Sequence, residues 1–330
     1  MKVLVLGHVL PPETLVVGLL KRQLAARQVS SGFPLHKRWR ERAISFTGSH
    51  VPRPKRKSSQ RKKVRANGVE QAVFNQSTVI PILGDLDSNV WLPLIATLDV
   101  IIETVSASPD GLRSIFERTV KAAKELRPAG APLLSYIHTS GTWVHGDNRT
   151  DIVADTTPIA RPVELVAWRP AVEQLVAHST TVTGIVVRPA LLYGRSASIL
   201  APLFKGASSE GKVVWPGTPG GRYAVVHADD LADLFVRVAE RAPLLGGKIF
   251  DAANSQTESV DEMLQKLVQI SGAKGPYEYR KPENLYEEAI QATTLVRPYL
   301  ANALLGWSPK KPGLVESLDI YYAAWRASSA

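Results

Sequence analysis

Apolar and polar residues follow regular patterns in two parts of this chain, separated by a stretch that follows neither. Residues 2–7 (KVLVLG) are Leu and β-branched residues that end in Gly, which is typical of a buried strand. Over residues 13–28 the apolar positions recur at helical spacing, and Pro11 and Pro12 stand where a helix would begin. Residues 30–77 are polar, basic and broken by Pro, which predicts a disordered insert.

Regular periodicity returns at Thr78. Apolar runs that predict strands alternate with amphipathic stretches that predict helices, and after Gly194 the order loosens. This alternation indicates an α/β fold with a doubly wound parallel sheet and right-handed crossovers. The strands are continuous apolar runs, as expected when both faces of a sheet are covered. The predicted strands cover residues 78–83, 98–105, 132–140, 183–194 and 246–254, and the predicted helices cover 88–96, 111–126, 162–179, 230–240 and 260–272.

The formal charge of +10 over 330 residues belongs to one segment. Residues 30–68 hold twelve Lys or Arg and the single acid Glu41, so the rest of the chain is close to neutral. Three interpretations stay open: a solvated linker, a nuclear-localisation-like signal (PRPKRK, QRKKVR), or a nucleic-acid-binding arm. Nucleic acid is the least favoured, because Phe33, Trp39 and Phe46 are not interleaved with the densest charge, as stacking aromatics would be.

Composition and short apolar runs exclude several classes of protein. The chain has no Cys, which excludes disulfides, thiolate zinc sites and a cysteine nucleophile. The His residues show no metal-ligand spacing, so no metal is expected. No apolar run reaches the roughly 18 residues that a membrane span requires, and the run before Gly7 is too short for a signal peptide. A soluble cytoplasmic protein is expected.

Five short motifs follow the predicted elements in a fixed order. In this order and spacing they resemble the extended or atypical short-chain dehydrogenase/reductase superfamily, within its NAD-dependent epimerase/dehydratase group. The resemblance covers residues 1–7 and about 78–327. The motifs are GDLD at residues 84–87, TSGTWVHG at 139–146, VRPALLYG at 187–194, VHADDLA at 226–232 and LGWSP at 305–309.

The resemblance implies a Rossmann fold with two lobes. Residues 1–189, together with 223–251, would form the NAD(P)-binding domain, and residues 190–330 a smaller C-terminal substrate-binding lobe. Aromatic residues of the second lobe are candidates to line a substrate site, although core packing is the better interpretation for each of them. These residues are Trp215, Tyr223, Tyr277 and Tyr279.

The resemblance also implies residues that contact NAD or NADP. Asp85 and Leu86 would lie beside the adenine, and Arg188 and Pro189 near the reactive end of the cofactor. A buried arginine that pairs with a helix C-terminus is the structural alternative for Arg188. For His227 and its neighbours Asp229 and Asp230, hydrogen bonding at a strand end and helix capping is the favoured interpretation.

The catalytic pair of the resembled family is missing. Members use Tyr-x-x-x-Lys on a helix, in which the Lys lowers the pKa of the Tyr. Here Leu165 and Arg169 stand at these positions. Leucine cannot transfer a proton, and arginine can hold a ribose hydroxyl but is a poor proton relay. We therefore expect Ser140 or Thr142 to polarise a carbonyl and Arg169 to hold the ribose.

Tyr193 is the only phenol nearby that could replace the missing acid.

The glycine-rich phosphate turn of the family is missing as well. Only Gly7 fits it, while Leu10 and Glu13 occupy the later glycine positions, where they would block and repel a diphosphate. We interpret residues 8–77 as an altered coding segment, such as a retained intron or a shifted reading frame. RNA reads that match the chain across this segment would contradict that interpretation.

Three functions remain open at this level. The favoured hypothesis is an NAD(P)-dependent oxidoreductase or epimerase that acts on a small carbonyl, hydroxyl or nucleotide-sugar substrate. Alternatively the chain is a non-catalytic redox sensor that binds NADPH, or a chain that has lost its cofactor site. The resemblance allows a homodimer through paired helices.

Overall fold

A computed structural model describes residues 1–9, 14–21, 79–84, 87–194 and 198–329. The predicted disordered insert at 30–77, with its three interpretations, lies outside the described residues, as do Asp85 and Leu86. Among the described residues, no helix has the length and hydrophobicity needed to cross a membrane.

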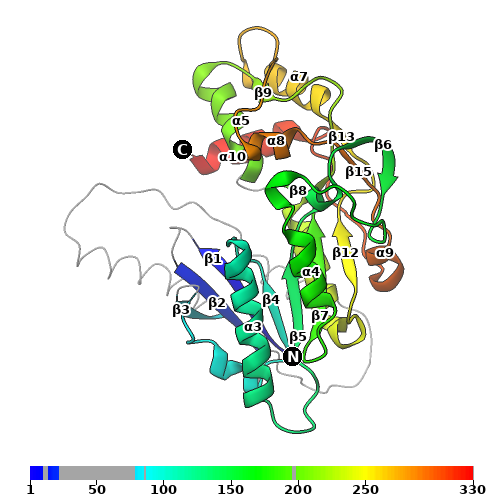
Figure 1. Ribbon diagram of the computed structural model, residues 1–330. Helices are drawn as coiled ribbons and strands as arrows, with labels where there is room; N and C mark the ends of the chain where they lie inside the picture. Colours follow the sequence, from blue (N-terminus) through cyan, green and yellow to red (C-terminus); the bar gives the residue numbers. More distant parts are fainter. Residues whose placement is uncertain (10–13, 22–78, 85–86, 195–197, 330) are drawn as a thin grey trace, which may run out of the picture. The chain divides into compact units, whose positions relative to one another are not determined.

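The central element is a mixed sheet of seven strands in the order β12-β7-β5-β4-β1-β2-β3 (Figure 1). Strand β1 (Lys2–Val9) pairs in parallel with β4 (Val100–Glu103), which pairs in parallel with β5 (Ser135–Thr139). Strand β7 (Thr183–Pro189) pairs in parallel with β12 (Ile249–Ala252). The predicted α/β fold with a parallel Rossmann-type sheet is confirmed for these strands.

One end of the sheet differs from the prediction. The helix expected over 13–28 is wrong for its described residues: β2 (Thr14–Lys21) is a strand antiparallel to β1, and β3 (Val79–Gly84) is antiparallel to β2. Residues 13 and 22–28 lie outside the described residues. The run LVVGLL within β2 is apolar at every position except its glycine, and such a short run fits a covered strand as well as a helix. The chain therefore turns back after β1 instead of crossing over through a helix.

Two compact units are formed from discontinuous parts of the chain. The first comprises residues 1–138, 176–185 and 239–247, and the second 139–175, 186–238 and 248–330. These boundaries follow packing within the chain. The predicted division at residue 189 into a cofactor domain and a substrate lobe stays a prediction.

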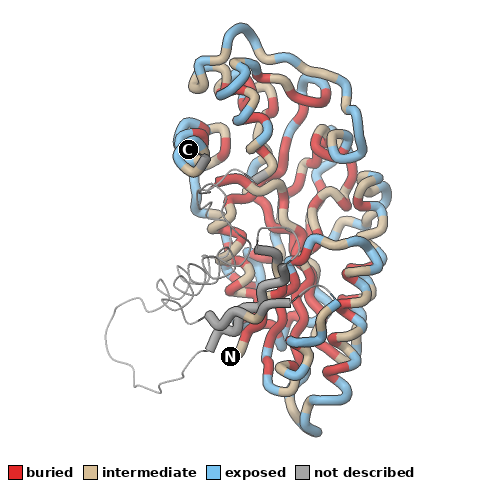
Figure 2. The backbone as a smooth tube through the Cα atoms, turned by 90° about the vertical axis from the view of Figure 1, so that its left-hand side faces the viewer, coloured by how far each residue is buried: buried red, intermediate tan, exposed pale blue. Residues whose placement is uncertain are grey.

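In the first unit, helix α3 (Pro109–Leu126) packs on the sheet (Figure 1). Its N-cap Ser108 accepts a hydrogen bond from the Gly111 N–H, and its apolar stripe places Phe116 edge-on against Tyr136 of β5 at 5.1 Å. Strands β4 and β5 are buried on both faces, and buried positions follow the strands of the sheet in Figure 2. The short helix η2 (Leu92–Ala96) completes this layer.

The second unit has its own core, in which aromatic residues from distant segments meet. Phe204 and Trp215 are buried there, and the Trp215 indole N–H donates to the Tyr223 hydroxyl at 2.7 Å. Tyr277 and Tyr279 both donate to Asp261 Oδ1 at 3.0 Å. All four aromatic residues that were candidates to line a substrate site therefore pack in the core or make structural hydrogen bonds.

The remaining elements include η7 in the first unit, while α4 and α6 have residues in both units and the others lie in the second. The helices are η3 (Thr142–His145), η4 (Glu164–Val166), α4 (Arg169–Ala177), η5 (Ser198–Leu200), α5 (Ala201–Lys205), η6 (Gly206–Glu210), α6 (Ala228–Arg241), η7 (Ala242–Leu244), α7 (Val260–Ser271), α8 (Leu285–Gln291), α9 (Leu300–Leu305) and α10 (Leu318–Ser329). The strands are β6 (Asn148–Val153), β8 (Leu191–Tyr193), β9 (Val214–Pro216), β10 (Arg222–Tyr223), β11 (Val225–His227), β13 (Glu258–Ser259), β14 (Glu278–Arg280) and β15 (Thr294–Val296).

A close approach between β7 and α4 gives a direct test of this packing. A Cβ atom at Gly184 would lie 1.8 Å from the Val176 carbonyl oxygen, so Gly184→Ala must move backbone and should lower the free energy of unfolding by about 1–3 kcal/mol. At Gly206 the nearest atom would be 3.5 Å away, and Gly206→Ala should change stability by less than about 0.5 kcal/mol. Urea unfolding measures both variants, and equal effects would contradict the packing.

Candidate active site

Two residues predicted from the sequence, Ser140 and Arg188, lie with other polar residues where three parallel strands end. Thr139 closes β5 and Ser140 follows it, and the Ser140 N–H donates to the Val187 carbonyl of β7 at 2.8 Å. Asp251 of β12 lies opposite Arg188 of β7 in the strand pairing. In open α/β sheets, ligands bind outside the carboxyl ends of the strands. We call Thr139, Ser140, Arg188, Asp251 and Asn254 the carboxyl-edge cluster.

Four oxygen atoms of this cluster are buried without a hydrogen-bond partner in the described part of the chain. They are Thr139 Oγ1, Ser140 Oγ, Asn254 Oδ1 and Asp251 Oδ1, the last of which lies 3.7 Å from Arg188 Nη1. A buried polar atom left unpaired costs about 1–3 kcal/mol, so such atoms are rare and call for an explanation. Hydroxyl and amide oxygens at the carboxyl ends of strands are suited to hold the hydroxyl or carbonyl groups of a ligand.

The turn after Ser140 depends on a glycine. Helix η3 begins at Thr142, which is buried, and ends at His145, where Gly146 follows with φ 78°. A Cβ atom at Gly146 would lie 1.9 Å from the Arg161 carbonyl oxygen, and that carbonyl is backbone. The positive φ and the close approach both require glycine at this position.

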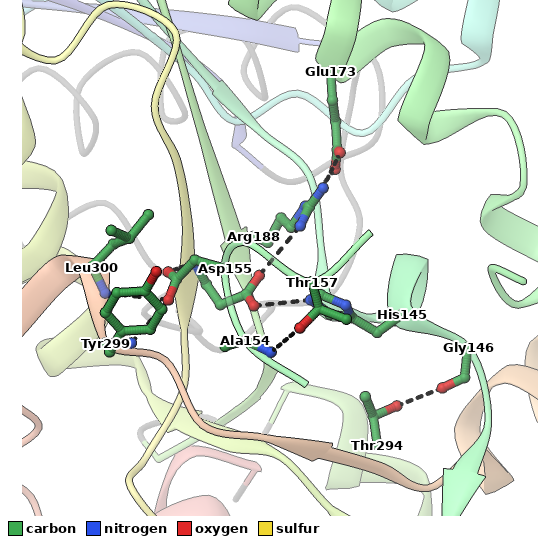
Figure 3. Close-up of polar contacts among 11 residues, drawn as sticks. His145, Gly146, Ala154, Asp155, Thr157, Glu173, Arg188, Thr294, Tyr299 and Leu300 are labelled. Atoms are coloured by element: carbon green, nitrogen blue, oxygen red, sulfur yellow. Dashed lines mark hydrogen bonds and ion pairs between the residues drawn. The ribbon is translucent and has the colours of Figure 1, made fainter. Parts of the chain in front are cut away.

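Arg188 lies between two buried carboxylates (Figure 3). Its Nε and Nη2 donate to Glu173 Oε1 and Oε2 at 3.0 and 2.6 Å, and its Nη1 lies 3.7 Å from Asp251 Oδ1. Burial by itself would lower the pKa of Arg188, but the hydrogen bonds and charges of the two carboxylates raise it. Arg188 is thus a permanent cation paired within the protein, and its partner is a side chain of helix α4 rather than a helix C-terminus.

Asp251 is held from two further sides. Its Oδ2 lies 2.8 Å from His145 Nε2, and its backbone N–H donates to Asp155 Oδ1 at 2.7 Å. Asp155 also accepts from the backbone N–H groups of Tyr299 and Leu300 at 2.8 and 3.2 Å. Burial raises the pKa of Asp155, and these backbone donors oppose that shift.

Arg169, at the position of the missing Lys, contacts this cluster. Arg169 begins α4, donates from Nη1 to the Thr139 carbonyl at 3.3 Å, and has its guanidinium 4.7 Å from the centre of the Trp168 ring. Leu165 lies in η4. Arg169 therefore contacts the strand end that carries the buried hydroxyls, while Leu165 adds no group that can move a proton.

Tyr193 has a structural role in the described residues. Its hydroxyl donates to the Pro312 carbonyl at 2.8 Å and accepts from Asn254 Nδ2 at 3.1 Å, and its ring lies edge-on to His227 at 5.2 Å. Burial raises the pKa of the Tyr193 phenol well above its usual value. Its assignment as the substitute acid stays a prediction.

His227 and Asp230 make hydrogen bonds at the end of β11 and in the first turn of α6, in line with the favoured interpretation. His227 Nδ1 accepts from the Asp229 N–H at 3.0 Å, and Asp230 Oδ2 accepts from the Lys311 N–H at 3.0 Å.

The sequence keeps only Gly7 of the family's glycine-rich phosphate turn, and in the structure Gly7 lies within a strand. Strand β1 continues through Gly7 to Val9, and Gly7 is paired with Val16 of β2. Only four residues connect β1 to β2, too few for a phosphate-binding helix. The described residues at this end of the sheet therefore do not fit a dinucleotide diphosphate bound in the usual way. Pro189, the last residue of β7, is paired with Ala252.

Sequence reasoning missed His145, Asp155, Asp251 and Asn254 as parts of this site. Within the described residues, no group of three or more His, Cys, Asp or Glu could hold a metal ion.

No protein-family model matches this chain, and no curated protein matches it. Solved structures do resemble it. UDP-glucose 4-epimerase from Thermotoga maritima, solved with UDP-glucose, has a TM-score of 0.59 and 17% identity over 75% of this chain and 84% of its own. MoeE5 in complex with UDP-glucuronic acid and NAD has a TM-score of 0.59 and 18% identity over 75% of this chain and 85% of its own.

A third similar structure is dTDP-glucose 4,6-dehydratase from Bacillus anthracis in complex with NAD. Its TM-score is 0.58, with 13% identity over 80% of this chain and 78% of its own. At these identities the likeness establishes the fold alone, which this chain shares with these epimerase and dehydratase structures. The fold implied by the sequence motifs is thereby confirmed.

The Arg188–Glu173 pair can be tested through stability. Glu173→Gln leaves a buried guanidinium without its bidentate partner and should lower the free energy of unfolding by about 3–5 kcal/mol. Glu283→Gln breaks an Arg280 ion pair of 3.4 Å whose side chains are 37% and 73% exposed, and should cost less than about 1 kcal/mol. Urea unfolding at neutral pH compares the variants, and a small effect at Glu173 would contradict the role given to the pair.

Proposed function

We propose that this protein is an oxidoreductase or epimerase that binds a nucleotide sugar, or another small hydroxyl- or carbonyl-bearing compound, at the carboxyl-edge cluster, with NAD or NADP as cofactor. The observation that carries the proposal is the pair of buried hydroxyls without a partner on the consecutive residues Thr139 and Ser140, at the end of a parallel strand. The similar epimerases and dehydratases, solved with NAD or with UDP-sugars, support the cofactor and the substrate class.

The side chains at the cluster support substrate binding and polarisation. Ser140 and Thr142 can donate hydrogen bonds to a substrate carbonyl or alkoxide, which stabilises negative charge as it develops on that oxygen. A guanidinium such as that of Arg169 stays protonated, so it can hold a hydroxyl group but cannot relay a proton. When bound, the nicotinamide supplies hydride transfer, and the protein supplies orientation and electrostatics.

A second candidate is a non-catalytic ligand sensor. Two observations favour it: Leu165 stands where a proton-transferring Tyr is needed, and β1 runs through Gly7 in place of a phosphate turn. A sensor would bind a ligand at the same cluster without turnover. The predicted homodimer and cytoplasmic location stay predictions for both candidates.

The first experiment measures binding and turnover separately. The full chain is titrated with NADH, NADPH and UDP-glucose by calorimetry, and any ligand that binds is then tested for conversion. Binding of a reduced cofactor with turnover of a sugar nucleotide supports the enzyme, and binding without turnover supports the sensor. No binding to any of the three, by a chain whose circular dichroism shows it to be folded, would overturn both.

Two serines of the same strand give a matched test of the cluster. Ser140 and Ser135 both carry buried hydroxyls without a partner in the described residues, but Ser135 begins β5 and Ser140 follows its end. Neither Ser→Ala change removes a hydrogen bond, so both should leave the free energy of unfolding unchanged or raise it by about 1 kcal/mol.

Only Ser140→Ala should weaken ligand binding, by about tenfold, because one hydrogen bond contributes roughly 1.4 kcal/mol. Equal ligand affinity in the two variants would place the ligand elsewhere.

A further inference from the structure

The turn that carries the cluster's hydroxyls is fastened at both ends. At its start, the Ser140 N–H donates to the Val187 carbonyl at 2.8 Å, and the Thr139 carbonyl accepts from Arg169. At its end, the Gly146 carbonyl accepts from Thr294 Oγ1 at 2.8 Å. Ser140 and Thr142 therefore lie between two fixed points of the backbone.

The side chain of His145 makes the other attachment at the end of the turn. Its Nε2 lies 2.8 Å from Asp251 Oδ2, and the two side chains are 1% and 0% exposed (Figure 3). A polar group that is buried and unpaired costs more free energy than the same group exposed to water. Because both side chains are buried, breaking this contact would lower the free energy of unfolding substantially. It joins helix η3 directly to strand β12, across 106 residues of sequence.

Asp251 is a fixed acceptor, which makes the attachment rigid. Its backbone is held by strand pairing with Arg188 and by the hydrogen bond to Asp155, which is itself held by Tyr299 and Leu300. Its other oxygen faces Arg188, which is clamped to Glu173 of α4. One chain of charged contacts thus runs from α4 through β7 and β12 to η3.

Glu173 and His145 are the first and last residues of this series of contacts, and both lie on helices that contact or carry the residues with the buried hydroxyls. Helix α4, which carries Glu173, also carries Arg169 on the Thr139 carbonyl, and η3, which carries His145, begins at Thr142. Binding groups must be held to within about 0.5 Å of their productive geometry to act on a ligand. The structure supplies that constraint through charged pairs rather than through apolar packing alone.

We propose that His145 is a positioning residue, which fixes the Ser140–Thr142 hydroxyls for ligand binding through its contact with Asp251. The role toward a ligand rests on the proposed function, whereas the fastening of the turn does not. A residue that replaces His145 must carry an N–H donor far enough along its side chain to reach Asp251. Glutamine can supply such a donor, asparagine is too short to reach, and leucine has none.

Amide hydrogen exchange of the full chain, followed by mass spectrometry, tests the fastening without any ligand. His145→Leu should raise the exchange rate of residues 140–146 at least tenfold, and His145→Gln should return it to within about threefold of the wild type. The matched control is Tyr223→Phe, which removes another buried hydrogen bond of the same unit, to Trp215, and should leave residues 140–146 unchanged.

Unchanged exchange in His145→Leu, or equal loosening throughout the second unit, would overturn the proposal. If the Leu variant does not fold, His145→Asn replaces it, and equal exchange in the Asn and Gln variants would overturn the proposal.

Calorimetric titration with UDP-glucose tests the role toward a ligand. His145→Leu should weaken binding at least tenfold, and His145→Gln should restore most of the affinity, an effect that general loosening of the unit would not produce. Wild-type affinity in His145→Leu would overturn the positioning role. If the wild type binds no UDP-glucose while exchange changes only at 140–146, the proposed function fails for this substrate and the fastening of the turn stands.

Discussion

The geometry of the whole candidate site depends on one buried guanidinium. Arg188 is 3% exposed and lies between Glu173, which is 0% exposed, and Asp251, also 0% exposed. Removing any one of these groups would leave a buried charge uncompensated, which costs far more than an exposed pair contributes. The three side chains therefore connect α4, β7 and β12 through residues of the second unit, and the other groups of the site lie on β5, on η3 or directly after a strand.

This arrangement separates the charged groups that stabilise the fold from the hydroxyls that we propose bind a ligand. The charged groups pair with one another or with backbone: Glu173 with Arg188, Asp251 with His145, and Asp155 with backbone N–H groups. Among their atoms, Arg188 Nη1 and Asp251 Oδ1, which lie 3.7 Å apart, make no hydrogen bond in the described residues. The hydroxyls of Thr139 and Ser140 are the groups left unpaired among the described residues of the turn. A well-satisfied frame that carries a few unsatisfied polar atoms is typical of binding sites, which sacrifice some stability for affinity.

The sequence predicted the parallel part of the sheet because strong periodicity and the ends of successive strands are local signals. Residues 13–28 were misread because LVVGLL has no alternation, and pairing with β1, which no local pattern records, made it a strand. Ser140 and Arg188 lie at strand ends and Thr142 in the turn that follows, as the motifs predicted, whereas Arg169, predicted within a helix over 162–179, is the first residue of α4. His145 and Asp251 were missed because their contact spans 106 residues, and a lone His carries no spacing signal. Gly146, required by its positive φ, was the one local sign of a constrained turn.

The central claim is that a ligand binds through the buried hydroxyls at the end of β5. A crystal structure of the full chain with UDP-glucose and NAD tests it most directly. The account predicts ligand oxygen atoms within about 3.2 Å of Ser140 Oγ and Thr139 Oγ1, a hydrogen-bonding distance, with the Arg188 pairs unchanged. A ligand bound elsewhere, or ordered water alone on these hydroxyls under saturating ligand, would contradict it.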